Sequence, residues 1–514
     1  MRDIHVPSGM RPSYSAAMDD SSERGSAGKP WTAIIIGTGF GGLGMAIALR
    51  RAGEDDILLL EKGRDVGGVW RENTYPGAAC DIPSHLYSFS FEPNPHWTRT
   101  YSPQAEILAY LRHCADKYGV REKIRFGCEV TSATFDEASS LWRVEWTDPA
   151  GQPRAGHARA LVSAVGLLTR PVIPALPGLG DFAGPVFHSA QWDHGVELRG
   201  KRIAVIGTGA SAIQFVPALA RLASRLTVFQ RTPPWILPRG DRAYSEAERR
   251  RFARWPWLMA AHRGWLYLQH DGRALGFTRL PWLMNLVGAR PARRLLRRQV
   301  ADPALRERLT PHYTIGCKRV LISDDWLPTL ARPDVELVTD AIEAVTPAGV
   351  RVAGGREVEA DAIVLGTGFA AHEFLAPMTI RGRVGRTLAE AWADGAKAWL
   401  GISVPAFPNF FMLYGPNTNL GHSSIVFMLE CQVAHVMRCL RKRRDARGSA
   451  IEVASAPFER YNARLQRRIQ GTVFTGCGNW YVDPQGRHTV NWPGFTTGYR
   501  WLTRHAGLSA YQVR

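Results

Sequence analysis

The chain of 514 residues lacks three features, and each absence excludes a class of protein. No stretch approaches the roughly 18 uninterrupted apolar residues of a membrane-spanning helix, so we expect no transmembrane segment. Acidic residues are few: 46 Asp and Glu face 64 Lys and Arg, for a net charge of +18. The seven cysteines include no Cys-x-x-Cys pair, which argues against an enzyme that passes electrons through a dithiol. We therefore expect reduced thiols and a cytoplasmic location.

The basic excess is concentrated in arginine-rich stretches at 249–254, 293–298 and 441–444. Such stretches ordinarily form a solvated surface, and we expect no nucleic-acid partner. Between the first two stretches, aromatic residues alternate with arginines, a composition that also suits an element lying on an anionic membrane surface. These aromatic residues are Trp255, Trp257, Trp265, Tyr267 and Trp282. The sequence thus allows a weak membrane-surface association as an alternative.

The length predicts two or three domains rather than one core. The first 30 residues are rich in Ser, Asp and Gly and contain no apolar run of the kind found in signal peptides, so we expect a disordered tail there. The pattern indicates no metal site.

A first glycine-rich turn, Gly37-x-Gly39-x-x-Gly42, follows the apolar run 33–36. Twenty-four residues past its first glycine, a second apolar run ends in Glu61. Glycines at such a turn let backbone N–H groups approach a pyrophosphate at a helix N-terminus, and a carboxylate at the second position accepts hydrogen bonds from a ribose diol. This unit predicts a site for the adenosine half of FAD.

A second turn, Gly207-x-Gly209-x-x-Ala212, has the same construction after the apolar run 203–206. Here the following run ends in Arg231, again 24 residues past the first glycine. A guanidinium at this position pairs with a 2′-phosphate, so the unit predicts NADPH. Two cofactors in one chain imply a hydride transfer between them. Other residues of this unit expected to line NADPH are Thr208, Ser211 and Gln214.

The alternation of apolar runs and helix-like segments predicts an α/β fold with two Rossmann-like dinucleotide-binding domains. We expect a discontinuous FAD domain over 31–180 and 341–514, with an NADPH domain over 181–340 inserted in it. Residues 240–310 predict a mostly helical insert within the second domain. The apolar run and glycine turn at 361–368 are expected to return the chain to the FAD domain.

A third motif, Phe182-x-Gly184-x-x-x-His188-x-x-x-Trp192-Asp193, stands between the two turns. It resembles the fingerprint of the type I Baeyer–Villiger monooxygenases, whose sister family, the flavin-containing monooxygenases, tends to carry another residue in place of Trp192. A second signature of the family also matches, over Gly67-Gly68-x-Trp70, Tyr75-Pro76-Gly77 and Asp81. The resemblance extends from Trp31 to about Arg500.

The resemblance implies that NADPH reduces FAD, that O₂ adds to the reduced flavin as a C4a-peroxide, and that this group attacks a ketone to form an ester or lactone. The segment Gly316-Cys317-Lys318-Arg319 resembles the Gly-x-Lys-Arg segment of the family. By that match Arg319 is the active-site cation and Asp81 is the carboxylate that orients it. Lys318 joins Arg231 and Thr232 around the 2′-phosphate.

The resemblance assigns further contacts. Trp70 and Tyr87 are expected to line FAD, and the backbone of Val130 to receive the adenine. Trp480 is expected to contact NADP and substrate. His188 is expected to position the two domains rather than act as a base. Aromatic residues such as these often serve core packing instead.

Two other functions remain open. One is a flavin-containing monooxygenase that oxygenates sulfur or nitrogen, although Trp192-Asp193 and Lys318-Arg319 favour a ketone. The other is a membrane-associated or partner-binding flavoprotein that has lost oxygenation. The segment 491–494 differs from that of the better-known cyclic-ketone enzymes, and the sequence does not name a ketone.

Overall fold

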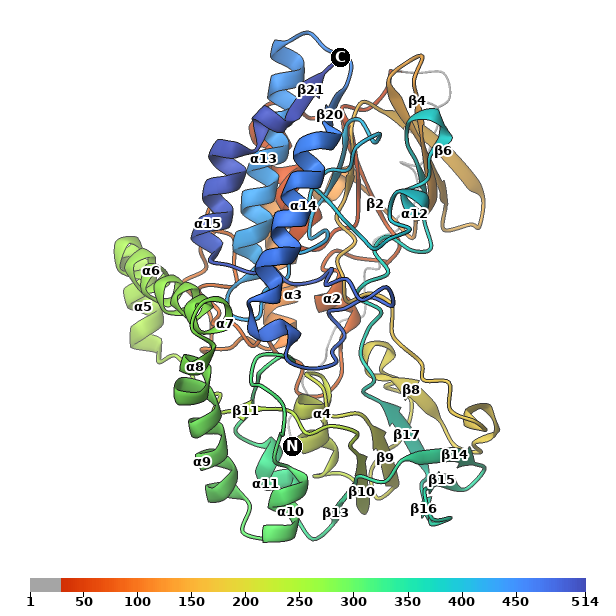
Figure 1. Cartoon of the computed structure of the whole chain (residues 1–514), viewed down its shortest axis with the longest axis vertical. Coiled ribbons are helices and arrows are strands. Elements are labelled where there is room, and N and C mark those ends of the chain that lie inside the picture. Colours follow the sequence, from red (N-terminus) through yellow and green to blue (C-terminus); the bar gives the residue numbers. More distant parts are fainter. Residues whose placement is uncertain (1–28) are drawn as a thin grey trace, which may run out of the picture.

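The computed structural model describes residues 29–514, so nearly all of the tail expected over residues 1–30 lies outside the described residues. Two five-stranded parallel sheets form the centres of two lobes, one above the other in Figure 1. Their strands are almost entirely buried and apolar, as parallel sheets covered on both faces require.

The first sheet has the order β19-β7-β1-β2-β3. Its strands are β1 (Ala33–Ile36), β2 (Ile57–Glu61), β3 (Ile124–Phe126), β7 (Leu161–Ser163) and β19 (Phe410–Met412). A mixed sheet in the same lobe has the order β18-β4-β5-β6, with β18 parallel to β4 and the other pairs antiparallel. Its strands are β4 (Glu129–Asp136), β5 (Leu141–Thr147), β6 (Pro153–Ala158) and β18 (Thr379–Arg381).

Helices cover the first sheet. The glycine turn leads from β1 directly into α1 (Phe40–Arg51), which packs against the long α13 (Ile425–Asp445). The other elements of this lobe are α2 (Val69–Glu72), α3 (Gln104–Lys117), α12 (Leu388–Ala391), α14 (Ser455–Gln470), α15 (Thr496–Trp501), β20 (Ile451–Val453) and β21 (Tyr511–Val513).

The second sheet has the order β13-β10-β9-β17-β8. Its strands are β8 (Val186–His188), β9 (Arg202–Ile206), β10 (Arg225–Phe229), β13 (Val335–Val338) and β17 (Ala362–Leu365). The helices α4 (Ala212–Leu219) and α11 (Trp326–Leu330) pack together in this lobe. A small antiparallel sheet comprises β14 (Ile342–Thr346), β15 (Gly349–Val352) and β16 (Glu357–Glu359).

The strand expected at 361–368 forms, but in the other lobe. β17 pairs in parallel with β9 and with β8, both of the second sheet. The expectation that it returns the chain to the FAD domain is therefore wrong. An apolar run followed by a glycine turn suits either sheet, and the pattern carries no information about the pairing partner. The chain rejoins the first lobe at β18, which pairs with β4, and β19, which pairs with β7. We propose that the second domain extends through β17 rather than ending at residue 340.

The insert is a closed excursion from the second lobe. It leaves after β11 (Ile236–Leu237) and returns before β12 (Leu321–Ile322), and these two strands pair with each other. Its helices run along one side of the molecule, with α5 and α6 projecting beside the junction of the lobes (Figure 1). They are α5 (Glu246–Arg254), α6 (Pro256–Gly272), α7 (Ala274–Thr278), α8 (Pro281–Met284), α9 (Arg290–Gln299) and α10 (Pro303–Arg308). Across residues 29–514, every helix is too short or too polar to span a lipid bilayer.

Candidate active site

The first glycine turn leaves no room for a side chain at Gly37 or Gly42. Gly37 has φ +95°, and a Cβ there would lie 2.8 Å from the carbonyl oxygen of Ala164. A Cβ at Gly42 would lie 1.9 Å from the carbonyl oxygen of Gly37. Gly39, the second glycine of the turn, is the N-cap of α1, and its carbonyl oxygen accepts from the N–H of Leu43 at 3.0 Å. The turn therefore brings bare backbone to the N-terminus of α1, the arrangement that receives a pyrophosphate.

Glu61 is fixed against this turn. Its Oε2 accepts hydrogen bonds from the backbone N–H of Thr38 at 3.0 Å and from the Thr38 hydroxyl at 2.7 Å. Its Oε1 accepts from the N–H of Gly63 at 2.8 Å and pairs with Nη1 of Arg71 at 2.9 Å. The carboxylate at the end of β2 thus faces the glycine turn, as a ribose contact requires. Sequence reasoning missed Arg71, whose only signal is its place directly after the Gly67-Gly68-x-Trp70 motif.

The second turn tolerates an alanine for a structural reason. Gly207 has φ +113°, and a Cβ there would lie 2.4 Å from the carbonyl oxygen of Gly366. Gly366, which follows β17, also faces Ala212: a Cβ on Gly366 would lie 3.3 Å from that of Ala212. The side chain of Ala212 fits because the opposing residue has none. Gly209 is exposed at the tip of the turn, and Ser211 is the N-cap of α4.

Two cations lie together beside the second turn. Burial, and next the charge of Arg231, lower the pKa of Lys318, so the two charges are within electrostatic reach although 87 positions apart in the chain. Arg231 is exposed, and neither residue forms an ion pair within 29–514. The Thr208 hydroxyl donates to the carbonyl oxygen of Thr232 at 3.3 Å, which joins the turn to the end of β10. A pair of cations without a carboxylate suits a phosphate.

Arg319 and Asp81 form an ion pair across the lobes. Nε of Arg319 donates to Oδ2 of Asp81 at 3.1 Å, and its Nη2 contacts the same oxygen. Burial alone would raise the pKa of Asp81, but the charge and hydrogen bonds of Arg319 outweigh it, so the pKa is lowered. The charge of Asp81 raises the pKa of Arg319 above its usual value. The side chains remain 30% and 31% exposed, so the cation is held in place and accessible.

Three residues that sequence reasoning missed surround this pair. Burial raises the pKa of Tyr481 to about 12 and also raises that of Tyr414, while the charge of Arg319 acts on both phenols in the opposite direction. Nη2 of Arg239 donates to the carbonyl oxygen of Cys80 at 3.2 Å, next to Asp81. Tyr481 follows Trp480 directly, which was a usable signal; Tyr414 and Arg239 come from segments without a motif.

The Tyr75-Pro76-Gly77 signature holds the two lobes together. Oε1 of Gln214, on α4, accepts from the hydroxyl of Tyr75 at 3.0 Å and from the N–H of Ala79 at 3.3 Å. Its Nε2 donates to the carbonyl oxygen of Ala79 at 3.0 Å. A Cβ on Gly77 would lie 2.7 Å from the carbonyl oxygen of Gln214. The amide of Gln214 therefore serves the contact between lobes in this structure, although the sequence suggested a cofactor contact.

The fingerprint around His188 packs the edge of the second sheet. Nδ1 of His188 accepts from the N–H of Ala190 at 3.1 Å, and burial lowers the pKa of the imidazole. The ring of Trp192 packs between Phe187 and Phe215, with ring centroids 5.2 and 5.5 Å away. These contacts tie β8 to α4, which suits a positioning role.

The remaining fingerprint residues have local roles. A Cβ on Gly184 would lie 2.4 Å from the carbonyl oxygen of Asp361, and Phe182 is buried in the same region. Oδ1 of Asp193 accepts from the N–H of Gly195 at 2.8 Å, which caps a loop. The fingerprint thus shapes the second lobe.

Four residues expected near the cofactors lie in three places, because Trp70 and Tyr87 contact each other. Nε1 of Trp70 donates to the Tyr87 hydroxyl at 3.3 Å, and the two rings meet edge to face. Val130 is buried on β4 beside an irregularity in the pairing with β5. Trp480 is 37% exposed, with its ring centroid 4.5 Å from that of Tyr481.

A disulfide corrects the expectation of reduced thiols. Cys317 and Cys477 are bonded, although 160 positions separate them, while the other five cysteines are free and buried. The expectation is wrong for this pair because sequence spacing alone does not determine disulfide connectivity. Cys317 precedes Lys318 and Arg319, and Cys477 lies three residues before Trp480. The bond therefore ties the Trp480 loop to the segment that carries Arg319.

Comparison with known proteins fits this geometry. Residues 31–251 match the family model described as flavin-binding monooxygenase-like. A Baeyer–Villiger monooxygenase of Pseudomonas aeruginosa is 50% identical over 93% of the chain and 90% of the relative, and one of Streptomyces coelicolor is 45% identical over 93% and 92%. The fold and paired turns define a flavin-binding monooxygenase-like protein. Within that class, the chain belongs to the Baeyer–Villiger monooxygenases.

Solved structures of the family share the whole architecture. A closed structure of cyclohexanone monooxygenase matches with a TM-score of 0.85 at 28% identity, covering 95% of this chain and 100% of that chain. An oxidized steroid monooxygenase bound to NADP matches with a TM-score of 0.83 at 31% identity, covering 94% and 99%. The two-lobed arrangement is therefore that of the family.

Proposed function

We propose that this protein is an FAD-containing, NADPH- and O₂-dependent monooxygenase that inserts one oxygen atom next to a ketone carbonyl, giving an ester or lactone. The observation that carries the proposal is the ion pair of Arg319 and Asp81, formed where the segment after the second turn meets the first lobe. FAD binds at the first turn and NADPH at the second.

The residues present fit both cofactors. At the first turn, the glycines leave bare backbone at a helix N-terminus, and the Glu61 carboxylate faces it. At the second, Arg231 and Lys318 supply an unneutralised pair of positive charges for a 2′-phosphate. When bound, FAD would supply the redox chemistry, namely hydride uptake from NADPH and reaction with O₂. Trp70, Tyr87 and Val130 complete our proposed FAD contacts.

Arg319 supplies a permanent positive charge to the reaction. A guanidinium does not lose its proton at physiological pH, so negative charge that develops on oxygen is stabilised throughout the cycle. Asp81 accepts from Nε and Nη2 of Arg319 and so fixes the direction of the guanidinium plane. The phenols of Tyr414 and Tyr481 are protonated at neutral pH, since their ordinary pKa is about 10 and burial raises it further. They are therefore neutral neighbours that leave the charge of Arg319 available.

The loop that carries Trp480 closes the site. Its attachment to Cys317 holds the exposed indole close to the Arg319 segment, where we place its contact with NADP and substrate. His188 and Trp192 position β8 relative to α4 and leave the acid–base chemistry to other groups.

Product analysis tests the proposal against oxygenation of sulfur or nitrogen. The purified enzyme with FAD and NADPH is incubated with a panel of ketones and a panel of thioethers and amines. We expect ketones to give esters or lactones with consumption of one NADPH for each product. Oxygenated thioethers or amines, with no ester from any ketone, would identify the alternative function.

We also infer a weak association with anionic membrane surfaces and a cytoplasmic location. Three indoles of the insert are exposed, at 69% for Trp257, 60% for Trp265 and 61% for Trp282, beside arginine-rich helices. Indoles and arginines together favour a headgroup interface. The five free thiols fit a reducing compartment, whereas the bond between Cys317 and Cys477 does not. Co-sedimentation with anionic and neutral liposomes at low salt tests the association, and equal recovery with both would contradict it.

A further inference from the structure

Two adjoining hollows lie where the insert meets α14 and α15. The first, of about 420 Å³, is lined by Thr278, Arg279, Arg464 and Arg468. The second, of about 320 Å³, shares Arg279 and Arg468 with the first. Its other lining residues are Trp492, Phe495, Thr497, Gly498, Trp501 and Leu502. Cavities of this size accommodate small molecules.

The first hollow concentrates positive charge. Arg279, Arg464 and Arg468 come from two elements, and none of the three guanidinium groups forms an ion pair or a side-chain hydrogen bond with any residue from 29 to 514. Burial, and then the charges of Arg279 and Arg464, lower the pKa of Arg468. Like charges held together without a carboxylate favour an anion between them.

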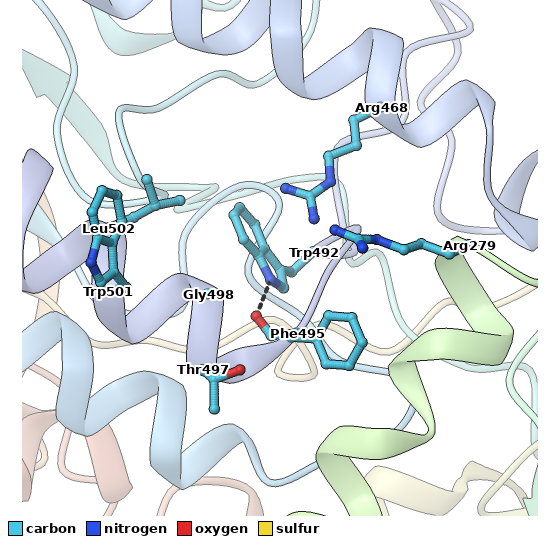
Figure 2. Close-up of a pocket in the computed structure, with 8 residues that line it drawn as sticks. All are labelled: Arg279, Arg468, Trp492, Phe495, Thr497, Gly498, Trp501 and Leu502. Atoms are coloured by element: carbon cyan, nitrogen blue, oxygen red, sulfur yellow. Dashed lines mark hydrogen bonds between the residues drawn. The ribbon is translucent and has the colours of Figure 1, made fainter.

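The second hollow is apolar and fixed in shape. Nε1 of Trp492 donates to the carbonyl oxygen of Phe495 at 3.1 Å, which holds the indole in place. Figure 2 shows the guanidinium groups of Arg279 and Arg468 converging beside this indole. The guanidinium carbon of Arg468 lies 5.8 Å from the ring centroid, within cation–π range. A Cβ on Gly494 would lie 2.8 Å from Nη2 of Arg468, so glycine there leaves room for the guanidinium.

Trp501 and Leu502 extend the apolar wall outward. Trp501 is 59% exposed, and a Cβ added at Gly498 would meet no neighbouring atom within 4 Å, so this end of the hollow is open. A ligand with a charged head at the arginines can therefore lay an apolar chain along Trp492 and Trp501. None of the residues that surround Arg319 and Asp81 lines either hollow.

We propose that the paired hollows form a binding site for an amphipathic anion: a molecule with a carboxylate, sulfate or phosphate head and an apolar chain. The head binds between Arg279, Arg464 and Arg468, and the chain lies against Trp492, Phe495 and Trp501. This site is separate from the proposed oxygenation site and does not depend on the reaction assigned to it.

Calorimetric titration of the flavin-loaded full chain tests the site. The probes are decanoate, decyl sulfate and decyl phosphate, each below its micelle concentration, with decanol, decyltrimethylammonium and inorganic phosphate as controls. We expect one anionic amphiphile to bind per chain, at least about tenfold more tightly than decanol or the cation, because charge-assisted contacts add to apolar burial. Phosphate binding as tight as that of decyl phosphate would show that the apolar wall contributes nothing and would overturn the proposal.

Variants locate the site. The double variant that combines Arg279→Gln and Arg468→Gln is expected to weaken decanoate binding at least about tenfold. Arg467→Gln is the matched control, because it removes the same charge from α14 at a residue that lines neither hollow. Equal weakening in the control, or unchanged binding in the double variant, would overturn the proposal. Should the double variant unfold, Arg279→Gln alone answers the question, since this exposed side chain has no partner to lose.

Discussion

Arg319 donates through Nε to Oδ2 of Asp81 at 3.1 Å, although 238 positions separate the two residues in the chain. Asp81 belongs to the first lobe, and Arg319 lies just before β12, where the excursion returns to the second lobe. The ion pair therefore exists only when both lobes and the excursion between β11 and β12 are in place. The cation is therefore fixed in direction only in the fully folded protein.

Removing this cation is expected to separate reduction from oxygenation. Arg319→Ala should still accept a hydride from NADPH, seen as anaerobic bleaching of the flavin, because the cofactor turns are unchanged. Ester formation should be lost by at least about 100-fold, since the charge that stabilises developing negative charge is gone. Arg242→Ala, an exposed arginine paired with Glu248, is the control. Ester formation at the wild-type rate by Arg319→Ala would refute the assignment.

Arg231 is expected to distinguish NADPH from NADH. Arg231→Ala should weaken NADPH binding by about 1–3 kcal/mol, as loss of a charge-assisted contact does. Binding of NADH, which has no 2′-phosphate, should change little. Arg225→Ala, at the other end of β10, removes a charge paired with Glu336 and should affect neither cofactor. Titration of the oxidised variant and wild-type enzymes with each nucleotide measures both affinities. An equal loss of affinity for NADPH and NADH would contradict the phosphate contact.

The disulfide predicts a thiol count. Without reductant, the denatured chain should contain five reactive thiols, and seven after reduction. Cys477→Ser should lower the melting temperature, because a closed loop of 160 residues restricts the unfolded chain, an effect of about 2–5 kcal/mol. Reduced wild type and Cys477→Ser should then melt alike. Seven reactive thiols in the protein as isolated would show that the bond does not form.

The hydrogen bonds of Glu248 predict that the insert stabilises the protein in a pH-dependent way. Hydrogen bonds from Arg242 and from the N–H of Ser245 lower the pKa of Glu248 from 4.5 to about 2. Because the folded pKa is depressed, the stabilisation is complete above pH 4.5 and is lost as the pH falls toward 2. Glu248→Gln should destabilise the protein by less than about 1 kcal/mol at pH 7, since the pair is partly exposed.

The difference between Glu248→Gln and wild type should shrink progressively below pH 4.5. Glu246→Gln is the control, because Glu246 and Arg250 are both 73% exposed and contribute little. Thermal melts of the three proteins at pH 7, 5 and 4 measure the effect. A difference that grows toward low pH would have the wrong sign and would contradict the assigned hydrogen bonds.

Short-range features of the molecule could be predicted from the sequence. Glu61 is the last residue of β2 and Arg231 lies two residues past the end of β10, each at a fixed spacing from a glycine turn, so the covalent chain itself places them. The location of β17 could not be predicted in this way, because an apolar strand pairs equally well in either sheet.

The parts of the site that depend on tertiary packing could not be predicted from the sequence either. Arg239 and Tyr414 come to Asp81 and Arg319 from distant segments that carry no motif of their own. The bond between Cys317 and Cys477 joins segments whose proximity follows only from the folded arrangement. Asp81 and Arg319 were found because each stands in a short motif that resembles a family pattern.

The pairing of β11 with β12 closes the insert at its base, so its helices begin and end at one point of the second lobe. A segment anchored in this way can lengthen, shorten or exchange its outer surface while neither nucleotide sheet moves. Divergence among relatives can therefore proceed in the helices α5 to α10, altering what the enzyme meets at its surface, while the base of the segment, which carries Arg239 and Arg319, stays in place.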